Sequence, residues 1–208
     1  PDKIMKGTLN MDISNMNNIE SRVQSYWTKR AHNFNIVRKN ELNSSISERW
    51  REEIVHFLPE GKVLQILDVG TGSGILSIAA LKLGAGHAVG TDLDPCAIDA
   101  TYENMENNGI SRDKYEVMIG NIIDDKAVQD KVGYECYDIV AANILAPVLV
   151  ELTPVIVNQL KPGGIYITSG IIDDKEETVK EAVAKAGLEL IDVTYQGEWV
   201  CVTARKRN

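Results

Sequence analysis

The stretch that decides the fold is Asp68-Val69-Gly70-Thr71-Gly72-Ser73-Gly74. It ends the short apolar run 63–69, which is typical of a buried parallel strand, and it precedes the run 75–83, which predicts a helix closed by Gly84. Glycines in such a turn let the backbone approach a ligand closely, and the free N–H groups at the helix start favour an anionic group. The stretch therefore predicts a strand–turn–helix unit that binds a ligand.

The alternation of strand and helix continues along the chain. Further strands are expected at 88–91, 115–119, 137–142 and 165–169, helices at 95–108, 146–160 and 174–186, and a terminal hairpin at 188–195 and 199–206. Repeated right-handed crossovers give a parallel sheet that is covered on both faces. We expect an α/β, doubly wound, Rossmann-like sheet of seven mostly parallel strands with a C-terminal antiparallel hairpin.

The residues before this sheet divide into two parts. Residues 1–18 show no periodicity and are expected to be a disordered lead or an expression remnant. Residues 19–60 predict two helices, about 19–33 and 47–58, which we interpret as an N-terminal helical lid. Residues 61–208 are then the ligand-binding domain.

Composition narrows the class of protein. The chain has 208 residues and a net charge of −8, which argues against a surface that neutralises phosphates, so no nucleic-acid partner is expected. No apolar run of eighteen residues and no signal-peptide core occur, which favours a cytoplasmic protein without a membrane partner, either a monomer or a homodimer. The three cysteines are widely spaced, so neither a disulfide framework nor a metal site is expected.

The spacing of the glycines separates two kinds of ligand. A dinucleotide site with the pattern G-x-G-x-x-G would need glycine at position 75, where this chain has Ile75. A carboxylate at Asp68 would repel a diphosphate but suits the ammonium of a methionine moiety. We therefore expect a methyltransferase that uses S-adenosylmethionine. The residues expected to hold the donor at the turn are Asp68, Gly70, Thr71, Gly72 and Gly74.

An acidic residue ends the second predicted strand. Asp92 lies 18 residues after Gly74, where a carboxylate can accept hydrogen bonds from both ribose hydroxyls of a nucleoside. Asp94 is better used as a helix cap before Pro95, and Leu93 between the two acids is placed at the nucleoside site. The same carboxylate would serve a nicotinamide dinucleotide, so it indicates a nucleoside and not the chemistry.

Two asparagines follow the third and fourth predicted strands. Asn121, with Ile122 beside it, could bond an adenine edge, although a plain asparagine turn explains the residue nearly as well. Asn143 opens the loop Asn143-Ile144-Leu145-Ala146-Pro147, which faces the donor across the switch point of the sheet. Asn143 is our catalytic candidate, as an orienter of an incoming amine or of the donor's own amino group, unless this is a generic strand-to-helix loop. It is not a base, and no general base stands out.

From about Leu67 to its end the sequence resembles the catalytic domain of the PrmA family, the methyltransferases of large-subunit ribosomal protein eleven. The residues that carry the resemblance are 68–80, Gly90-Thr-Asp-Leu-Asp-Pro95, Asn143-Ile-Leu-Ala146, Leu160-Lys-Pro-Gly-Gly164, Ser169-Gly-Ile171 and Glu198-Trp-Val200. The resemblance implies N-methylation of protein amines with S-adenosylmethionine as the donor.

The N-terminal part departs from that family. We expect no room in these 208 residues for the additional domain that grips the ribosomal protein in the family, and nothing before Asp68 matches the family's stretch that packs on the donor. The segment 26–31 instead resembles the lid helix of small-molecule methyltransferases, which implies that Tyr26 and Arg30 close over the donor's carboxylate. A small-molecule or a protein acceptor remains open, with a slight preference for the former.

Two other functions compete with this interpretation. The chain could be a module that binds S-adenosylmethionine without turnover, as a recombined or engineered chimera joined near Asp68–Gly74. An oxidoreductase that uses a nicotinamide dinucleotide is disfavoured by Ile75 and by the terminal hairpin.

Overall fold

The computed structural model describes residues 63–208, which belong to one compact unit, Gly61–Asn208. The expectations for residues 1–18 and for the lid at 19–60, with Tyr26 and Arg30, lie outside the described residues. The elements are β1 (Gln65–Val69), α3 (Ile75–Lys82), β2 (His87–Asp92), α4 (Cys96–Asn107), β3 (Tyr115–Ile119), α5 (Lys126–Val132), β4 (Tyr137–Asn143), α6 (Ala146–Ile156), β5 (Leu160–Ile172), α7 (Glu176–Lys185), β6 (Leu188–Gln196) and β7 (Trp199–Lys206).

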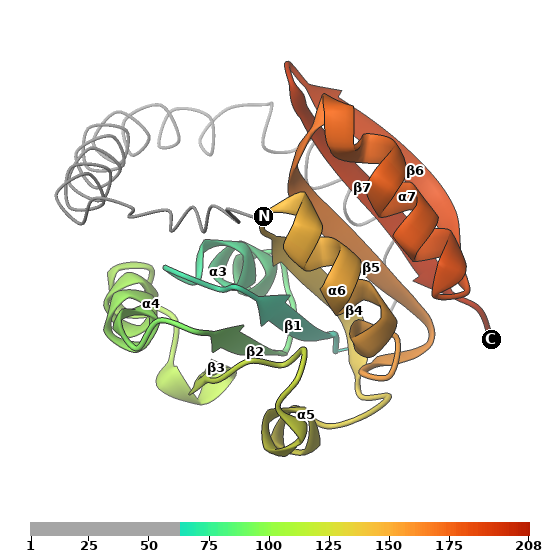
Figure 1. Cartoon of the computed structure of the whole chain (residues 1–208). Helices are drawn as coiled ribbons and strands as arrows, with labels where there is room; N and C mark the ends of the chain where they lie inside the picture. Colours follow the sequence, from blue (N-terminus) through green and yellow to red (C-terminus); the bar gives the residue numbers. More distant parts are fainter. Residues whose placement is uncertain (1–62) are drawn as a thin grey trace, which may run out of the picture. The chain divides into compact units, whose positions relative to one another are not determined.

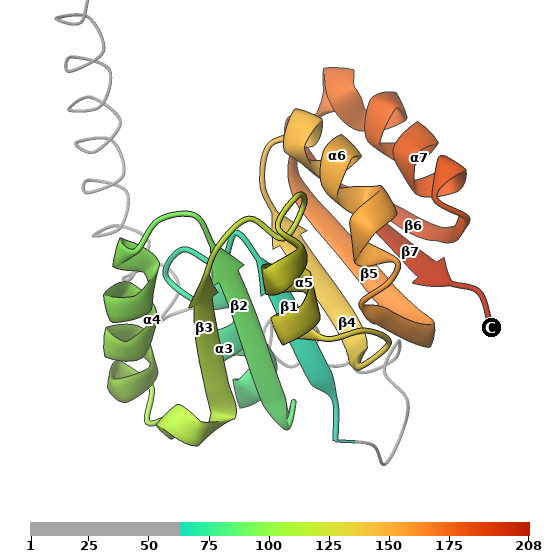
Figure 2. The same ribbon diagram turned by 60° about the horizontal axis from the view of Figure 1, so that its bottom comes forward.

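The seven strands form one sheet in the order β3-β2-β1-β4-β5-β7-β6. The pairs from β3 to β5 are parallel, and β7 pairs antiparallel with both β5 and β6. Helices α3 and α4 lie on one face of the sheet, and α5, α6 and α7 lie on the other (Figures 1 and 2). The doubly wound sheet with a C-terminal hairpin is confirmed.

The order of the strands creates one switch point. From β1 the chain moves to β2 and β3 on one side, and then returns to β4 and β5 on the other side. In open sheets of this kind, ligands bind at the carboxyl ends of the two strands that flank the reversal. The loops after β1 and β4 are therefore the expected place for a site.

Most of the core lies beneath α6 and α7. Leu149, Leu152 and Ile156 of α6 are fully buried, and their spacing of three and four residues puts them on one face of the helix. They join apolar residues of β1, β4, β5 and β7 in one cluster. This packing fixes the ends of β1 and β4 relative to each other. No helix among residues 63–208 is both long and apolar enough to cross a bilayer.

The boundary between α6 and β5 differs most from the prediction. The helix expected at 146–160 ends at Ile156, and Leu160 already belongs to β5. Pro154 lies within α6 and has no N–H to donate to the preceding turn, and the helix ends two residues after it. Pro162-Gly163-Gly164 lies inside β5, where the register with β4 shifts.

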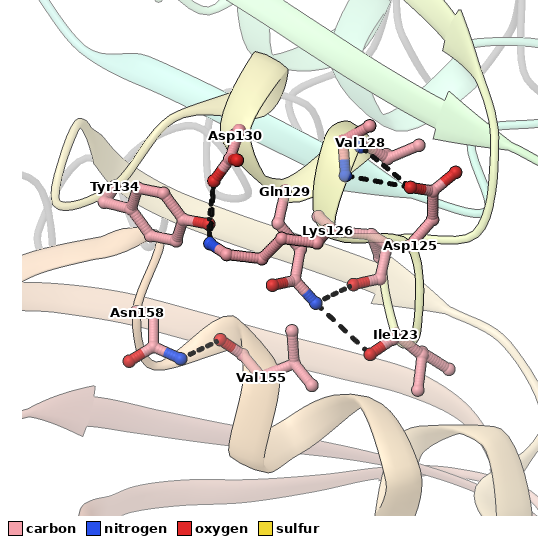
Figure 3. A network of polar contacts seen from close by, with 11 residues as sticks. Ile123, Asp125, Lys126, Val128, Gln129, Asp130, Tyr134, Val155 and Asn158 are labelled. Carbon is pink, nitrogen blue, oxygen red and sulfur yellow. Dashed lines mark hydrogen bonds and ion pairs between the residues drawn. The ribbon is translucent and has the colours of Figure 1, made fainter.

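Figure 3 shows the polar contacts around α5, which follows β3. The Asp125 carboxylate accepts hydrogen bonds from the backbone N–H groups of Ala127, at 2.8 Å, and Val128, at 3.4 Å. On the outer side of the helix, Lys126 Nζ lies 2.7 Å from Asp130 Oδ1, and both side chains are exposed. Asp125 is thus a helix cap, whereas the ion pair is a solvated contact.

Removing this cap should have a measurable cost. Asp125→Ala should lower the free energy of unfolding by about 0.5–2 kcal/mol, because two N–H groups of the first helical turn lose their acceptor. Lys126→Ala in the same turn should cost much less, since water screens the exposed pair. Urea unfolding of both variants checks this. An equal loss in the two would mean that the cap is not the stabilising contact.

Candidate functional site

The turn after β1 has a backbone that only glycine adopts easily. Gly70, Gly72 and Gly74 have φ angles of 72°, 54° and 75°, in the left-handed region. The N–H groups of Gly70 and Thr71 donate to Thr91 O of β2, at 2.8 and 3.1 Å. Gly74 N donates to Thr71 O at 2.8 Å and forms the N-cap of α3. The turn is therefore tied to β2 at the carboxyl edge of the sheet.

One side of this turn is open. Gly72 is exposed, and a Cβ built on it would meet no heavy atom of residues 63–208 within 4 Å. At Gly70 a Cβ would lie 2.5 Å from Ile144 Cγ2, so the loop after β4 packs closely against the turn at that residue. A ligand can thus approach the backbone at Gly72, with the β4 loop beside it. A turn that binds a ligand through its backbone needs such an accessible surface.

The Asp68 carboxylate supports the turn from behind. Its side chain is 1% exposed, and Oδ2 accepts hydrogen bonds from Thr71 Oγ1, at 2.8 Å, and from Ser77 Oγ, at 3.0 Å. Burial raises the pKa of Asp68, and the two hydroxyl donors partly offset that rise. The predicted direct contact of this carboxylate with a ligand's ammonium stays a prediction. Thr71 is also buried.

The raised pKa of Asp68 gives a test by pH. A carboxyl whose pKa is higher in the native than in the unfolded state stabilises the fold below its unfolded value of 3.8, and this contribution is lost as pH rises through the native pKa. Relative to Asp68→Asn, the wild type should therefore lose unfolding free energy as pH rises from about 4 towards neutrality. Urea titrations of both proteins measure the difference. A difference that stays constant or moves the opposite way would contradict the assigned shift.

Asp92 connects β2 to the glycine turn. Its Oδ2 accepts the N–H of Gly72 at 2.7 Å, and its Oδ1 accepts the N–H of Asp94 at 2.9 Å. Each carboxylate oxygen retains a lone pair for a further donor. The structure thus brings the predicted ribose ligand and the turn together. Leu93 is 68% exposed beside them, and Asp94 Oδ1 accepts the N–H of Cys96 at 2.9 Å, which confirms the predicted cap.

The residues after β3 fit the plainer alternative. Asn121 Oδ1 accepts the N–H of Ile123 at 3.1 Å, which is an asparagine turn. Ile122 is 2% exposed and belongs to the hydrophobic core, and its place at the nucleoside site stays a prediction. Gln129 of α5 also contacts this residue, because its Nε2 donates to Ile122 O at 2.9 Å. A bond from Asn121 to an adenine edge stays a prediction.

Asn143 lies at the same edge as the turn. It is the last residue of β4, is exposed, and pairs in register with Ser169 of β5. Gly170 has φ 78°, and a Cβ there would lie 2.8 Å from Asn143 Oδ1 and 3.0 Å from Ile144 O. The β4 loop is therefore seated between Gly170 on one side and Gly70 on the other. This contact explains why the chain has glycine at position 170.

Sequence reasoning missed two further residues of the site. Tyr115 of β3 and Gly90 of β2 both lie against Thr71, as described below. Glycine inside a strand indicates close approach of another group, so Gly90 carried a signal. Tyr115 carried none, because its contact depends on the register of three strands.

Comparison with known proteins gives one consistent family. Residues 49–207, about three quarters of the chain, match the family "Ribosomal protein L11 methyltransferase (PrmA)". The match begins before Leu67, where the sequence analysis placed the start of the resemblance, and so includes part of the predicted lid.

Individual proteins similar to this chain carry the same family description. A ribosomal protein L11 methyltransferase of Lachnospira eligens is 58% identical over 144 residues, which are 69% of this chain and 45% of that protein. One of Agathobacter rectalis is 56% identical over 141 residues, 68% of this chain and 44% of that protein. The crystal structure of a ribosomal protein L11 methylase from Lactobacillus delbrueckii subsp. bulgaricus superposes with a TM-score of 0.65 at 28% identity, over 79% of this chain and 81% of that one.

The chain spans about half the length of the relatives it matches in sequence. The matched family covers the whole of the described sheet, including the glycine turn, Asp92 and the β4 loop. The chain belongs to the ribosomal protein L11 methyltransferase (PrmA) family.

Proposed function

We propose that this protein transfers a methyl group from S-adenosylmethionine to an amine of a protein. The observation that carries the proposal is the hydrogen bond between the backbone of Gly72 and the carboxylate of Asp92. An open backbone turn and a carboxylate with spare lone pairs meet at the switch point, with 2.7 Å between Gly72 N and Asp92 Oδ2. Family membership supports the reaction class.

The described residues fit the methyl donor better than a dinucleotide. Ile75 stands where a dinucleotide turn has its third glycine, and a buried acid, Asp68, lies behind the turn. Asp92 would accept the ribose hydroxyls, and the open backbone at Gly72 would receive the methionine part. When bound, S-adenosylmethionine supplies a methyl group that its sulfonium already activates.

The remaining task of the protein is alignment and exclusion of water. Alignment of an amine with an activated methyl group is worth roughly 7–11 kcal/mol of the barrier when it is complete. Asn143 is the candidate for this role, because it is exposed at the end of β4 and its loop touches the donor turn through Ile144. The amine must arrive neutral, and a lysine amine with an ordinary pKa of about 10.4 needs desolvation or a neighbouring acceptor for that.

The comparisons change which methyl acceptor we prefer. The lid resemblance favoured a small molecule. The relatives that match this chain are named for methylation of a ribosomal protein, and the family match extends back to residue 49. We therefore propose a protein amine as the acceptor.

Methyl labelling of a cell extract tests this proposal. The protein is incubated with extract and S-adenosylmethionine that carries a labelled methyl group, with and without excess S-adenosylhomocysteine. We expect label in protein bands, and a loss of this label when the competitor is present. Label confined to small molecules would contradict the protein acceptor. Donor binding without any labelled product would favour the alternative of a binding module without turnover.

A further inference from the structure

A buried tyrosine reaches the glycine turn from two strands away. Tyr115 begins β3 and is 1% exposed, and its hydroxyl contacts Thr71 Oγ1. A Cβ at Gly90 of β2 would lie 2.7 Å from Tyr115 Oη and 2.9 Å from Thr71 Cγ2. A Cβ at Gly74 would lie 3.1 Å from the Tyr115 ring. The ring thus occupies space that exists because both neighbouring positions are glycine.

The number of hydroxyl protons decides which group donates in the hydrogen bonds among Asp68, Thr71 and Tyr115. The Thr71 hydroxyl has one proton, which it donates to Asp68, so the Tyr115 hydroxyl must donate to Thr71. Ser77 donates to the same carboxylate oxygen. Burial raises the pKa of Tyr115 far above its usual value, which keeps this donor protonated. One carboxylate is therefore the final acceptor for hydroxyls from three different parts of the chain.

The arrangement acts on the residue next to Thr71. Thr71 is held by its backbone to β2 and by its side chain to Asp68 and Tyr115. Gly72 follows directly, and its N–H is the group that Asp92 accepts. A shift of Thr71 would move this N–H away from Asp92 and change the open surface of the turn.

We infer that Tyr115 is a positioning residue for donor binding, which acts through Thr71 on Gly72 and Asp92. The inference rests on the proposed function, because it assumes that the turn binds the methyl donor. Tyr115 itself does not touch the donor: its side chain is buried behind the turn.

Removal of the hydroxyl alone tests this role. Tyr115→Phe retains the ring against Gly74 and Gly90 but cannot donate to Thr71. The matched control is Tyr137→Phe. Tyr137 is also buried and donates its hydroxyl to Val132 O at 2.7 Å, but it lies at the start of β4, at the opposite end of the strand from Asn143. Both variants lose one buried hydrogen bond, and only one of these bonds supports the turn.

Calorimetry with S-adenosylhomocysteine, well below the unfolding temperature of each protein, gives the decisive comparison. Tyr115→Phe should weaken the affinity by about 2–10-fold, the range of one net hydrogen bond, while Tyr137→Phe should leave it unchanged. Equal affinity of the two variants would overturn the inference while the proposed function stands. Absence of binding by the wild type would overturn the proposed function, and the inference with it.

A second measurement needs no ligand. A Cβ at Gly90 would collide with the Tyr115 hydroxyl, so Gly90→Ala should lower the urea midpoint more in the wild type than in the Tyr115→Phe background. Additive effects of the two substitutions would mean that the hydroxyl does not hold the position seen here, and would contradict the inference independently of any donor.

Discussion

Gly74→Ala is expected to lower the free energy of unfolding by about 2–5 kcal/mol. Two costs add at this position. Gly74 has φ 75°, which an L-residue adopts at a cost of about 1–2 kcal/mol. A Cβ there would also lie 2.8 Å from Thr101 Cγ2 and 3.1 Å from Tyr115 Cε1, and overpacking a filled core typically costs about 1–3 kcal/mol.

Gly72→Ala is the matched control in the same turn. Gly72 also has a left-handed φ, of 54°, but a Cβ there would meet no atom of the described part of the chain within 4 Å. This variant should lose only about 1–2 kcal/mol of unfolding free energy, the cost of the backbone alone. Its donor affinity should fall, because the methyl group would occupy the surface on which the donor lies. If urea unfolding gave equal losses for the two variants, the packing assigned to Gly74 would be wrong.

Asp92→Ala is expected to weaken donor binding by about 1–3 kcal/mol, or about 5–150-fold. The variant loses the acceptor of the predicted ribose hydrogen bonds, and these are strong because the acceptor is charged. It also releases the N–H of Gly72, which Asp92 holds at 2.7 Å. Calorimetric titration with S-adenosylmethionine measures the change in affinity.

The control for this prediction is Asp99→Ala. Asp99 lies in the first turn of α4, is exposed, and carries the same charge. Its removal should change affinity only slightly, because exposed charges are screened by salt. Equal losses for the two variants would indicate a long-range effect of charge on the cationic donor. Unchanged affinity of Asp92→Ala would mean that the ribose is placed wrongly.

Much of the fold could be predicted because its signals are local. Each buried parallel strand is an apolar run followed by a turn, and the terminal hairpin is two β-rich runs around Gln196-Gly197-Glu198. The boundary between α6 and β5 could not be placed this way. Pro162-Gly163-Gly164 has the composition of a turn, but Leu160 before it and Ile165 after it both pair with β4, and β5 runs through it.

In the candidate site, too, only the features with a local sequence signal could be predicted. The turn, Asp92 and Asn143 were found because they follow strands in the sequence, and parallel strands carry such residues to one edge. The surroundings of the side chains could be predicted less well. Asp68 bonds Thr71 and Ser77, three and nine residues further along the chain. Ile122 packs into the core, and Tyr115 meets Thr71 across β2; these two contacts join distant segments and leave no pattern in the local sequence.

The central claim is that the turn after β1 accepts a sulfonium nucleoside and not a diphosphate. Parallel calorimetric titrations of the wild-type protein with S-adenosylmethionine, S-adenosylhomocysteine and oxidised nicotinamide dinucleotide test it most directly. We expect saturable one-site binding of the first two ligands and no heat of binding with the third. Binding of the dinucleotide, or no binding of either sulfur compound at millimolar concentration, would contradict the claim.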